Sequence, residues 1–148
     1  MSINLIVMKK NVPISSIMSK NVIKLNLTDD LTKAEQLFKK HHIRHIPVVS
    51  SNKIVGMLSY TDLLRISFAD AVDDDADVVD VTVYNMFTVE QVMAKKLVTV
   101  SPETTIKEVA EILSCREFHA LPVVEGQLLV GIVTTTDIIK YLLEQYTN

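Results

Sequence analysis

Two short runs of the chain place a hydroxyl residue and an aspartate where a predicted strand turns into a predicted helix. Ser59 precedes Asp62 by three residues, and Thr134 precedes Asp137 by the same spacing. A hydroxyl, unpaired backbone N–H groups and a carboxylate at one helix N-terminus can hold a phosphate group, while the carboxylate accepts hydrogen bonds from both hydroxyls of a ribose. The pattern therefore predicts a nucleotide site in each run.

The same aspartates have a simpler explanation. A carboxylate in the first turn of a helix interacts favourably with the positive end of the helix dipole, by about 0.3–1 kcal/mol. From the two runs alone, helix stabilisation and ligand binding both remain open.

The two runs belong to a repeat that covers most of the chain. A shift of 75 residues aligns the two halves with no insertion, and it brings proline, glycine and aspartate into register together. The aligned pairs are Met18 with Met93, Leu31 with Ile106, Leu37 with Ile112, Pro47 with Pro122, Val48 with Val123, Gly56 with Gly131 and Asp62 with Asp137. We therefore expect two copies of one structural unit.

Each copy is predicted to begin with a short strand followed by a helix. The opening strands are the β-branched runs 21–25 and 97–100. Thr28 and Ser101 are predicted N-caps of the helices, and Pro102 suits the first helical position. Apolar residues at helical spacing predict one buried stripe in each helix, Leu31, Ala34 and Phe38 in the first copy and Ile106, Val109, Ala110 and Leu113 in the second.

Two further strands and a second helix complete each copy. The predicted strands are 46–50 and 54–59 in the first copy, and 121–125 and 128–134 in the second. The closing helices begin at residues 60 and 135. The fold class is therefore mixed α/β (α+β), with two tandem βαββα units. A three-stranded unit of about 55 residues cannot bury its sheet face alone, so we expect the copies to pack as a pseudo-twofold pair.

The predicted organisation is an N-terminal segment (1–12), a first unit (13–70), an acidic linker (71–87) and a second unit (88–148). Asp73, Asp75 and Asp77 have the opening spacing of a calcium-binding loop, but Val78 and Tyr84 stand where that loop requires glycine and glutamate. We interpret the run as a solvated linker kept open by its own charge.

Composition restricts the class of protein. Hydrophobic residues make up 48% of the 148 residues and aromatic residues 5%, so aliphatic side chains must fill the core. The net charge is -3 and the basic residues are scattered, which disfavours nucleic-acid binding. Apolar stretches are too short for a bilayer and no secretory signal is visible, so we expect a cytoplasmic protein with no membrane association. The positive mean hydropathy indicates oligomerisation.

Cys115 is the single cysteine, which excludes an internal disulfide framework and a CxxC motif. We expect it near a helix end as a small buried residue. His41, His42 and His45 lie close in sequence, but their spacing matches no standard zinc pattern, so no metal site is predicted. The chain has no nucleophile elbow and no P-loop, which disfavours an enzyme.

The doubled pattern "NVIKL…HIRHIPVV…IVGMLSYTD" and "LVTV…EFHALPVV…LVGIVTTTD" resembles a tandem pair of cystathionine-beta-synthase (CBS) domains, the Bateman module. The resemblance spans residues 13 to about 143. It implies a regulatory, energy-sensing module that binds AMP, ADP, ATP, S-adenosylmethionine or a related adenosyl ligand in the cleft between the copies, with no cofactor and no catalysis. It also implies a homodimer. Since the chain leaves no room for a catalytic domain, we expect it to act on a separate partner protein.

The resemblance also implies the residues of each site. The adenine slot of the Asp137 site is expected from Val22, Ile23, Ile43 and Arg44, and that of the Asp62 site from Leu97, Val98, Phe118 and His119. Cations at the phosphate end are expected from Arg44, His45 and His119, with Arg44 preferred because its planar fork matches phosphate oxygens. Ala120 replaces His45 in the second copy, so the two clefts are expected to be unequal. The alternative function is a dimerisation or scaffold module with vestigial clefts.

Overall fold

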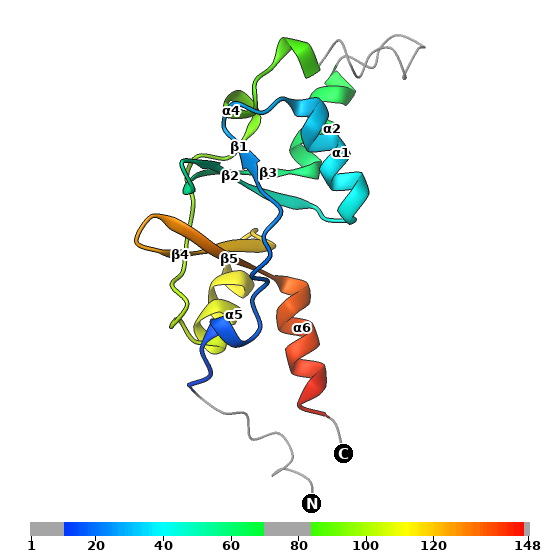
Figure 1. Cartoon of the computed structure of the whole chain (residues 1–148). Helices are drawn as coiled ribbons and strands as arrows, with labels where there is room; N and C mark the ends of the chain where they lie inside the picture. The colour runs from blue at the N-terminus through cyan, green and yellow to red at the C-terminus, as the bar shows by residue number, and fades with distance from the viewer. Residues whose placement is uncertain (1–10, 70–83, 147–148) are drawn as a thin grey trace, which may run out of the picture. The chain divides into compact units, whose positions relative to one another are not determined.

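The computed structural model describes residues 11–69 and 84–146. Contacts between residues divide the chain into two compact units. We call residues 23–97 the first-repeat unit, and residues 1–22 with 98–148 the second-repeat unit (Figure 1). The linker aspartates from Asp70 to Asp80, and with them the calcium alternative, lie outside the described residues.

The first-repeat unit contains three strands and their helices. β1 (Leu25–Asn26) pairs in parallel with β2 (His45–Ser50), which pairs antiparallel with β3 (Lys53–Ser59). α1 (Leu31–His41) connects β1 to β2, α2 (Tyr60–Ala69) follows β3, and the short α4 (Val89–Val92) comes after the linker. The predicted order of strand, helix, two strands and helix is confirmed.

The second-repeat unit repeats this order. It begins with a 3-10 turn, η2 (Ile14–Ser16), and continues with α5 (Ile106–Cys115), β4 (Ala120–Glu125), β5 (Leu128–Thr134) and α6 (Thr135–Glu144). β4 and β5 form an antiparallel hairpin. Val100 forms a single parallel bridge to Val123 at the position that β1 occupies in the first repeat.

The opening strands are shorter than predicted. Of the run 21–25 only Leu25 enters β1, and of the run 97–100 only Val100 makes a bridge. Leu25 and Val100 are buried. The error arises because β-branched residues indicate a half-buried surface and not a hydrogen-bonded ladder.

The predicted helix starts are also wrong, by two and four residues. Asp30 caps α1 by accepting a hydrogen bond from the Lys33 N–H at 2.8 Å. Thr105 caps α5 in a reciprocal capping box with Glu108. Ser101 instead closes a turn, in which its N–H donates to the Thr104 Oγ1 at 3.1 Å, and Pro102 lies in that turn and not in the helix.

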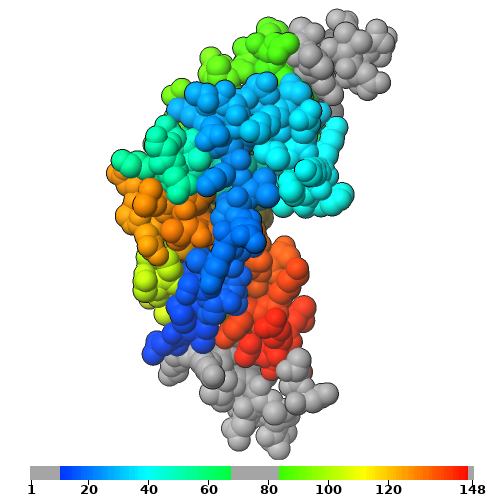
Figure 2. Space-filling model, viewed as in Figure 1, coloured from blue at the N-terminus to red at the C-terminus, as the bar shows by residue number. Residues whose placement is uncertain are grey.

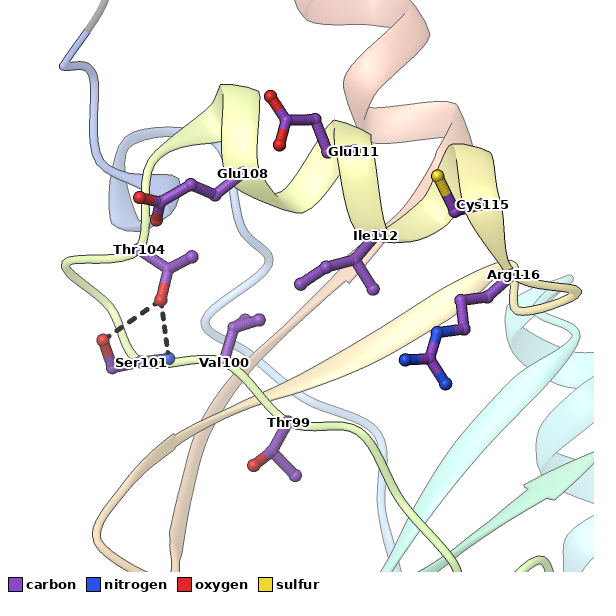
Figure 3. Close-up of a pocket in the computed structure, with 9 residues that line it drawn as sticks. All are labelled: Thr99, Val100, Ser101, Thr104, Glu108, Glu111, Ile112, Cys115 and Arg116. Carbon is purple, nitrogen blue, oxygen red and sulfur yellow. Dashed lines mark hydrogen bonds between the residues drawn. The ribbon is translucent and has the colours of Figure 1, made fainter.

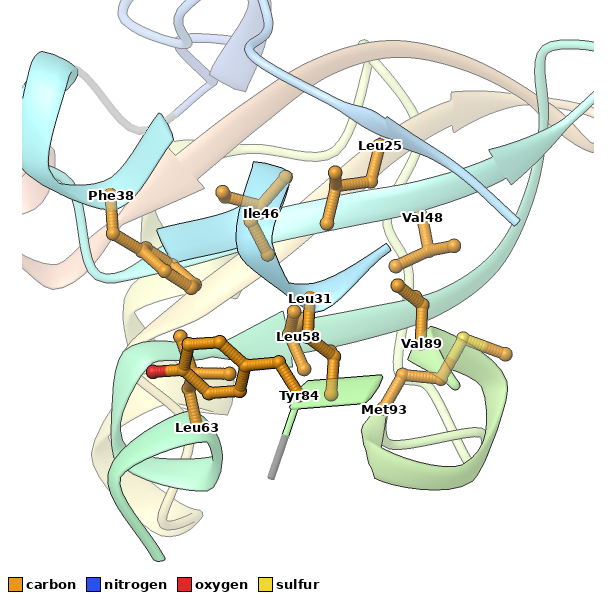
Figure 4. Packing of buried hydrophobic residues seen from close by; sticks show 11 residues of the cluster. Leu25, Leu31, Phe38, Ile46, Val48, Leu58, Leu63, Tyr84, Val89 and Met93 are labelled. Carbon is orange, nitrogen blue, oxygen red and sulfur yellow. The ribbon is translucent and has the colours of Figure 1, made fainter. Parts of the chain in front are cut away.

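The predicted helical stripes form the cores of the two units. Leu31, Ala34 and Phe38 are buried against the strands of the first-repeat unit, together with Tyr84 and with residues of α4 (Figure 4). Ile106 and Val109 are buried in the second-repeat unit, while Ala110 and Leu113 are half-buried. Tyr84 falls in the stretch predicted as linker, yet its side chain is only 5% exposed.

Each unit also includes a segment from outside its own contiguous repeat. Ser19 and Ile132 exchange two backbone hydrogen bonds in the second-repeat unit, and Met57 and Ala94 do the same in the first-repeat unit. The segment 11–22 runs along the surface beside α6 (Figure 2). Its Ile14 is fully buried in the core of that unit.

Two further expectations from the sequence concern membrane-spanning helices and the burial of Cys115. No helix within the described ranges combines the length and apolarity needed to cross a membrane. Cys115 ends α5 as expected, but it is exposed, so its predicted burial is wrong. The reason is helical geometry: the buried face of α5 carries Ile106 and Val109, and Cys115 lies on another face.

Candidate functional site

The two residues of each predicted hydroxyl–aspartate pair are hydrogen-bonded to each other at the start of the closing helix. The Thr134 N–H donates to the Asp137 Oδ2 at 2.9 Å, and the Asp137 N–H donates to the Thr134 Oγ1 at 3.2 Å. The corresponding bonds between Ser59 and Asp62 measure 3.4 and 3.0 Å. Both pairs are therefore reciprocal capping boxes, which stabilise the N-termini of α2 and α6.

The backbone N–H groups predicted to be unpaired at these helix starts are largely paired. In the first repeat, Ser59 and Asp62 donate to each other's side chains, and the Tyr60 N–H donates to the Arg44 carbonyl at 2.8 Å. In the second repeat, the Thr135 N–H donates to the His119 carbonyl at 2.9 Å. A phosphate at either helix start would therefore depend on side-chain cations more than on backbone donors.

The carboxylates of Asp62 and Asp137 differ in the hydrogen bonding of their second oxygen, Oδ1. Asp62 Oδ1 accepts a hydrogen bond from Arg65 at 3.1 Å, in an ion pair whose arginine side chain is 72% exposed. Lys140 stands at the equivalent position after Asp137, and within residues 11–69 and 84–146 it makes no ion pair with Asp137. The Asp137 Oδ1 has no hydrogen-bond partner in that part of the chain, so it is the freer acceptor.

The residues that precede the middle strands lie next to these helix starts within their own units. His45 is directly opposite Ser59 in the β2–β3 ladder, and Ala120 is opposite Thr134 in the β4–β5 ladder. The carbonyl contacts above place Arg44 beside Tyr60 and His119 beside Thr135. Arg44 and His119 are exposed, His45 is half-buried and Ala120 is buried.

The predicted apolar slot residues are half-buried. Ile43 packs against the core of the first-repeat unit, and Val98 and Phe118 pack against that of the second-repeat unit. Core packing therefore accounts for part of their burial. The other predicted slot residues, Val22, Ile23 and Leu97, are also half-buried. The groupings that combine residues of both units stay predictions.

A cavity of about 240 Å³ lies at the end of α1, wholly within the first-repeat unit. Its lining residues are Phe38, Lys39, His42, Ile43, Arg44 and Tyr60. Ile43 and Arg44 were predicted as site residues, whereas the other four were missed. The signal available in the sequence was the basic run 39–45 together with an aromatic residue directly after Ser59.

A second, shallow groove of about 610 Å³ lies between α5 and the segment 99–101 (Figure 3). None of its lining residues was predicted as a site residue. Ile112 and Arg116 extend toward the segment 99–101, whereas Glu111 and Cys115 point away from it. The Glu108 carboxylate already accepts the Thr105 N–H at 3.2 Å. Since its polar groups diverge, the groove does not define a site.

Potential metal-ligating side chains do not cluster within the described residues. Nowhere in residues 11–69 and 84–146 do three His, Cys, Asp or Glu side chains gather closely enough to hold a metal ion. His41 and His42 are exposed at the end of α1, and His45 is half-buried in β2.

The two βαββα repeats, each with a hydroxyl–aspartate capping box at the start of its closing helix, define a tandem-repeat α/β module. The CBS domain model matches residues 14–69 and 89–144, more than half of the chain, so the chain belongs to the CBS domain family and carries a tandem pair.

Three relatives illustrate the similarity. Protein MJ1225 of Methanocaldococcus jannaschii is 26% identical over 133 residues, which cover 89% of this chain and 48% of that protein, and its solved structure superposes with a TM-score of 0.78. The CBS domain pair of protein MJ0100, solved with 5'-methylthioadenosine and S-adenosyl-L-methionine, is 25% identical with a TM-score of 0.76, covering 92% of this chain and 99% of that one. The CBS domain-containing protein YhcV of Bacillus subtilis is 26% identical over 121 residues, 82% of this chain and 79% of that protein.

The chain spans less than half the length of the first curated relatives that it matches, 48% of MJ1225 and 32% of protein MJ1404 of the same organism. The match therefore concerns the CBS pair.

Proposed function

We propose that this chain is a regulatory module that binds an adenosyl ligand and does not catalyse a reaction. The observation that carries the proposal is the Asp137 carboxylate, which is oriented by the Thr134 N–H while its other oxygen remains free to accept. The same hydroxyl–aspartate pair recurs at the equivalent position of the first repeat. The relative MJ0100, whose CBS pair holds adenosyl ligands, supports the choice of ligand class.

The proposed chemistry is recognition of the ribose by the carboxylate. An aspartate held in one orientation by a backbone N–H can accept both vicinal hydroxyls of a ribose, in charge-assisted hydrogen bonds worth about 1.5–3 kcal/mol. Arg44 is the proposed partner of a phosphate group, because its guanidinium is exposed and has no carboxylate partner among the described residues. AMP, ADP, ATP and S-adenosylmethionine are the candidate ligands.

Ligand-dependent stabilisation tests the proposal directly. Thermal unfolding is recorded with adenosine, AMP, ADP, ATP and S-adenosylmethionine, and calorimetry then measures the affinity of each ligand that raises the melting temperature. A ligand that binds only the folded chain stabilises it by about 2.7 kcal/mol at a hundredfold excess over its Kd. If none of the five ligands changes the melting temperature at millimolar concentration, the proposal is wrong.

We further propose that ligand binding alters a surface read by a partner protein. Since the chain matches only the CBS pair of its longer relatives, the identity of the regulated protein is open. Affinity capture with and without the ligand found by calorimetry tests this, and a partner whose binding does not depend on that ligand would contradict it.

A dimerisation module is the second candidate function, and the surface of α6 favours it. Ile139, Leu142, Leu143 and the following Tyr146 are 51%, 40%, 62% and 61% exposed. Large apolar side chains gathered on one exposed helix indicate an interaction surface. We propose a homodimer through α6. In the first repeat, the closing helix α2 offers less of such a surface, because Leu63 is fully buried and Leu64 is 37% exposed.

A further inference from the structure

The cavity at the end of α1, which we call the α1-end pocket, has one apolar wall and one cationic rim. Phe38 and Tyr60 form the wall, with ring centroids 5.3 Å apart and an interplanar angle of 59°. Ile43 extends this wall. Phe38 is only 3% exposed, so the wall is anchored in the core.

Lys39, His42 and Arg44 supply the rim. Lys39 forms an ion pair with Glu35 at 3.4 Å, and Glu35 also accepts the Tyr84 hydroxyl at 2.5 Å. Within the described ranges, neither the Arg44 guanidinium nor the His42 imidazole has a hydrogen-bond or ion-pair partner. The pocket therefore presents a full positive charge that no carboxylate of the described chain neutralises.

The helix dipole explains only part of this charge. Lys39, Lys40 and His41 lie in the last turn of α1, where cations interact favourably with the free carbonyl groups. His42 and Arg44 come after the helix ends. His42 also adopts the left-handed conformation, with φ 53° and ψ 41°, for which glycine or asparagine is the usual choice. The backbone therefore does not account for a histidine at this position.

The second repeat shows that the fold does not require these cations. A shift of 75 residues places Ser114 at the position of Lys39, Glu117 at that of His42 and His119 at that of Arg44. The second repeat forms the corresponding helix and strands without the basic cluster, and its helix α5 is capped by Arg116 in an extended conformation instead of a left-handed one. The cations are thus specific to the first repeat.

We propose that the α1-end pocket binds a small aryl phosphate, a phosphate monoester that carries a flat aromatic ring. The ring lies against Phe38 and Tyr60, and the phosphate meets the Arg44 fork, which can donate two parallel hydrogen bonds. Lys39 adds positive charge at the rim, and the His42 ring can donate a hydrogen bond from an N–H group. This site goes beyond the proposed function, with which it shares Arg44, and it depends on the first-repeat unit alone.

NMR titration of the full, isotope-labelled chain with phenyl phosphate, inorganic phosphate and phenol tests the proposal. Phenyl phosphate should give saturable shifts at the amides of residues 38–44 and Tyr60, inorganic phosphate weaker ones and phenol none that saturate. Removing the Arg44 charge in Arg44→Gln should weaken phenyl phosphate binding roughly tenfold or more, because a charge-assisted hydrogen bond is lost. Lys39→Gln and His42→Asn should each weaken it several-fold.

Lys40→Gln is the matched control, since Lys40 is an exposed cation of the same helix end but does not line the pocket. It should leave phenyl phosphate binding unchanged. His42→Asn preserves the backbone conformation, because asparagine tolerates the left-handed region. An equal loss in Lys40→Gln, or saturable shifts confined to residues 134–137, would overturn the proposal.

Titration with adenosine and AMP separates this proposal from the proposed function. Adenosine lacks the phosphate, so its affinity should be the same in His42→Asn and in the unmodified chain. If adenosine binds but phenyl phosphate does not shift the pocket residues, the α1-end site is wrong and the proposed function stands. If phenyl phosphate binds there and no adenosyl ligand binds anywhere, only the proposed function fails. AMP shows whether a nucleotide also occupies the pocket.

Discussion

The side chain of Met93 fills the space beside Gly56: a Cβ on Gly56 would stand 2.2 Å from the Met93 sulfur and 2.8 Å from its Cγ. Both residues are buried, Gly56 in β3 and Met93 directly after α4. The contact fixes the segment that follows the linker against the first-repeat sheet, next to the paired backbones of Met57 and Ala94. Glycine at position 56 is therefore a packing requirement.

Gly56→Ala should destabilise the chain. The added methyl group overlaps Met93 at its Cγ as well as its sulfur, so the whole side chain must move. Overpacking of this kind costs about 1–3 kcal/mol. Chemical denaturation measures the free energy of unfolding, and a change below about 0.5 kcal/mol would show that the core adapts freely.

A double-mutant cycle with Met93→Ala provides the control. Met93→Ala alone should be destabilising, because it leaves a cavity in the core of the unit. Gly56→Ala in that background should cost much less than in the unmodified chain, because the space is then free. Additive effects would mean that the two residues do not compete for the same volume.

The repeat could be predicted from sequence, but the pairing across it could not. A shift of 75 residues aligns Met18 with Met93 and Gly56 with Gly131. It does not reveal that Met93 contacts Gly56, or that the sulfur of Met18 would lie 2.6 Å from a Cβ on Gly131. Because the aligned residues are of the same type, the alignment cannot tell which methionine packs on which glycine. Only three-dimensional packing shows which segment joins which unit.

Thr105→Ala should destabilise α5, whereas Ser101→Ala should have a small effect. Thr105 accepts the Glu108 N–H at 3.1 Å in the capping box, and loss of an N-cap side chain costs about 1 kcal/mol. Ser101 contributes only exposed turn contacts with Thr104. Urea denaturation of both variants checks this, and a greater loss in Ser101→Ala would restore Ser101 as the cap.

The candidate site was predictable where the chemistry is local. The hydroxyl–aspartate pairs lie three residues apart, so their contact follows from the strand-to-helix turn. The α1-end pocket was missed because Phe38 and Tyr60 are distant in sequence and meet only through β2 and β3. A basic run at a helix end also has the helix dipole as a sufficient explanation until the pocket is seen.

Tyr84→Phe should loosen the segment that follows the linker. The Tyr84 hydroxyl donates to Glu35 in α1 and lies 3.4 Å from the Ser67 hydroxyl in α2. A hydrogen bond to a charged group contributes about 1.5–3 kcal/mol, so the free energy of unfolding should fall by an amount near the lower end of that range. Amide exchange should rise first at residues 84–92.

Tyr141→Phe is the matched control, because its ring packs against the core of the second-repeat unit and its hydroxyl has no partner among the described residues. Its free energy of unfolding should stay within about 0.5 kcal/mol of the unmodified chain. Equal losses in both variants would show that the Tyr84 hydrogen bonds contribute nothing specific.

Leu143→Glu should abolish the proposed homodimer while leaving the monomer folded. Leu143 is 62% exposed on α6, so the substitution removes an apolar contact only where another chain covers it. Sedimentation velocity at micromolar concentration should shift from dimer to monomer. Leu128→Glu is the control, since Leu128 is 46% exposed but lies at the start of β5. A chain that sediments as a monomer before any substitution would contradict the dimer.

The aspartates of the two closing helices separate ligand binding from helix stabilisation. Asp137→Ala should weaken adenosine binding roughly ten- to a hundredfold, because the charge-assisted hydrogen bonds to ribose are lost. It should also reduce the free energy of unfolding by about 1 kcal/mol, because the capping box is broken. Glu108→Ala breaks the equivalent capping box of α5, outside the predicted site, so it should cost similar stability with no loss of affinity.

Asp62→Ala should affect a second binding event, which is expected to be the weaker one because Arg65 already engages that carboxylate. Calorimetry with adenosine on the three variants measures both affinities. Unchanged affinity in both aspartate variants would assign Asp62 and Asp137 to helix capping alone and would favour the dimerisation module.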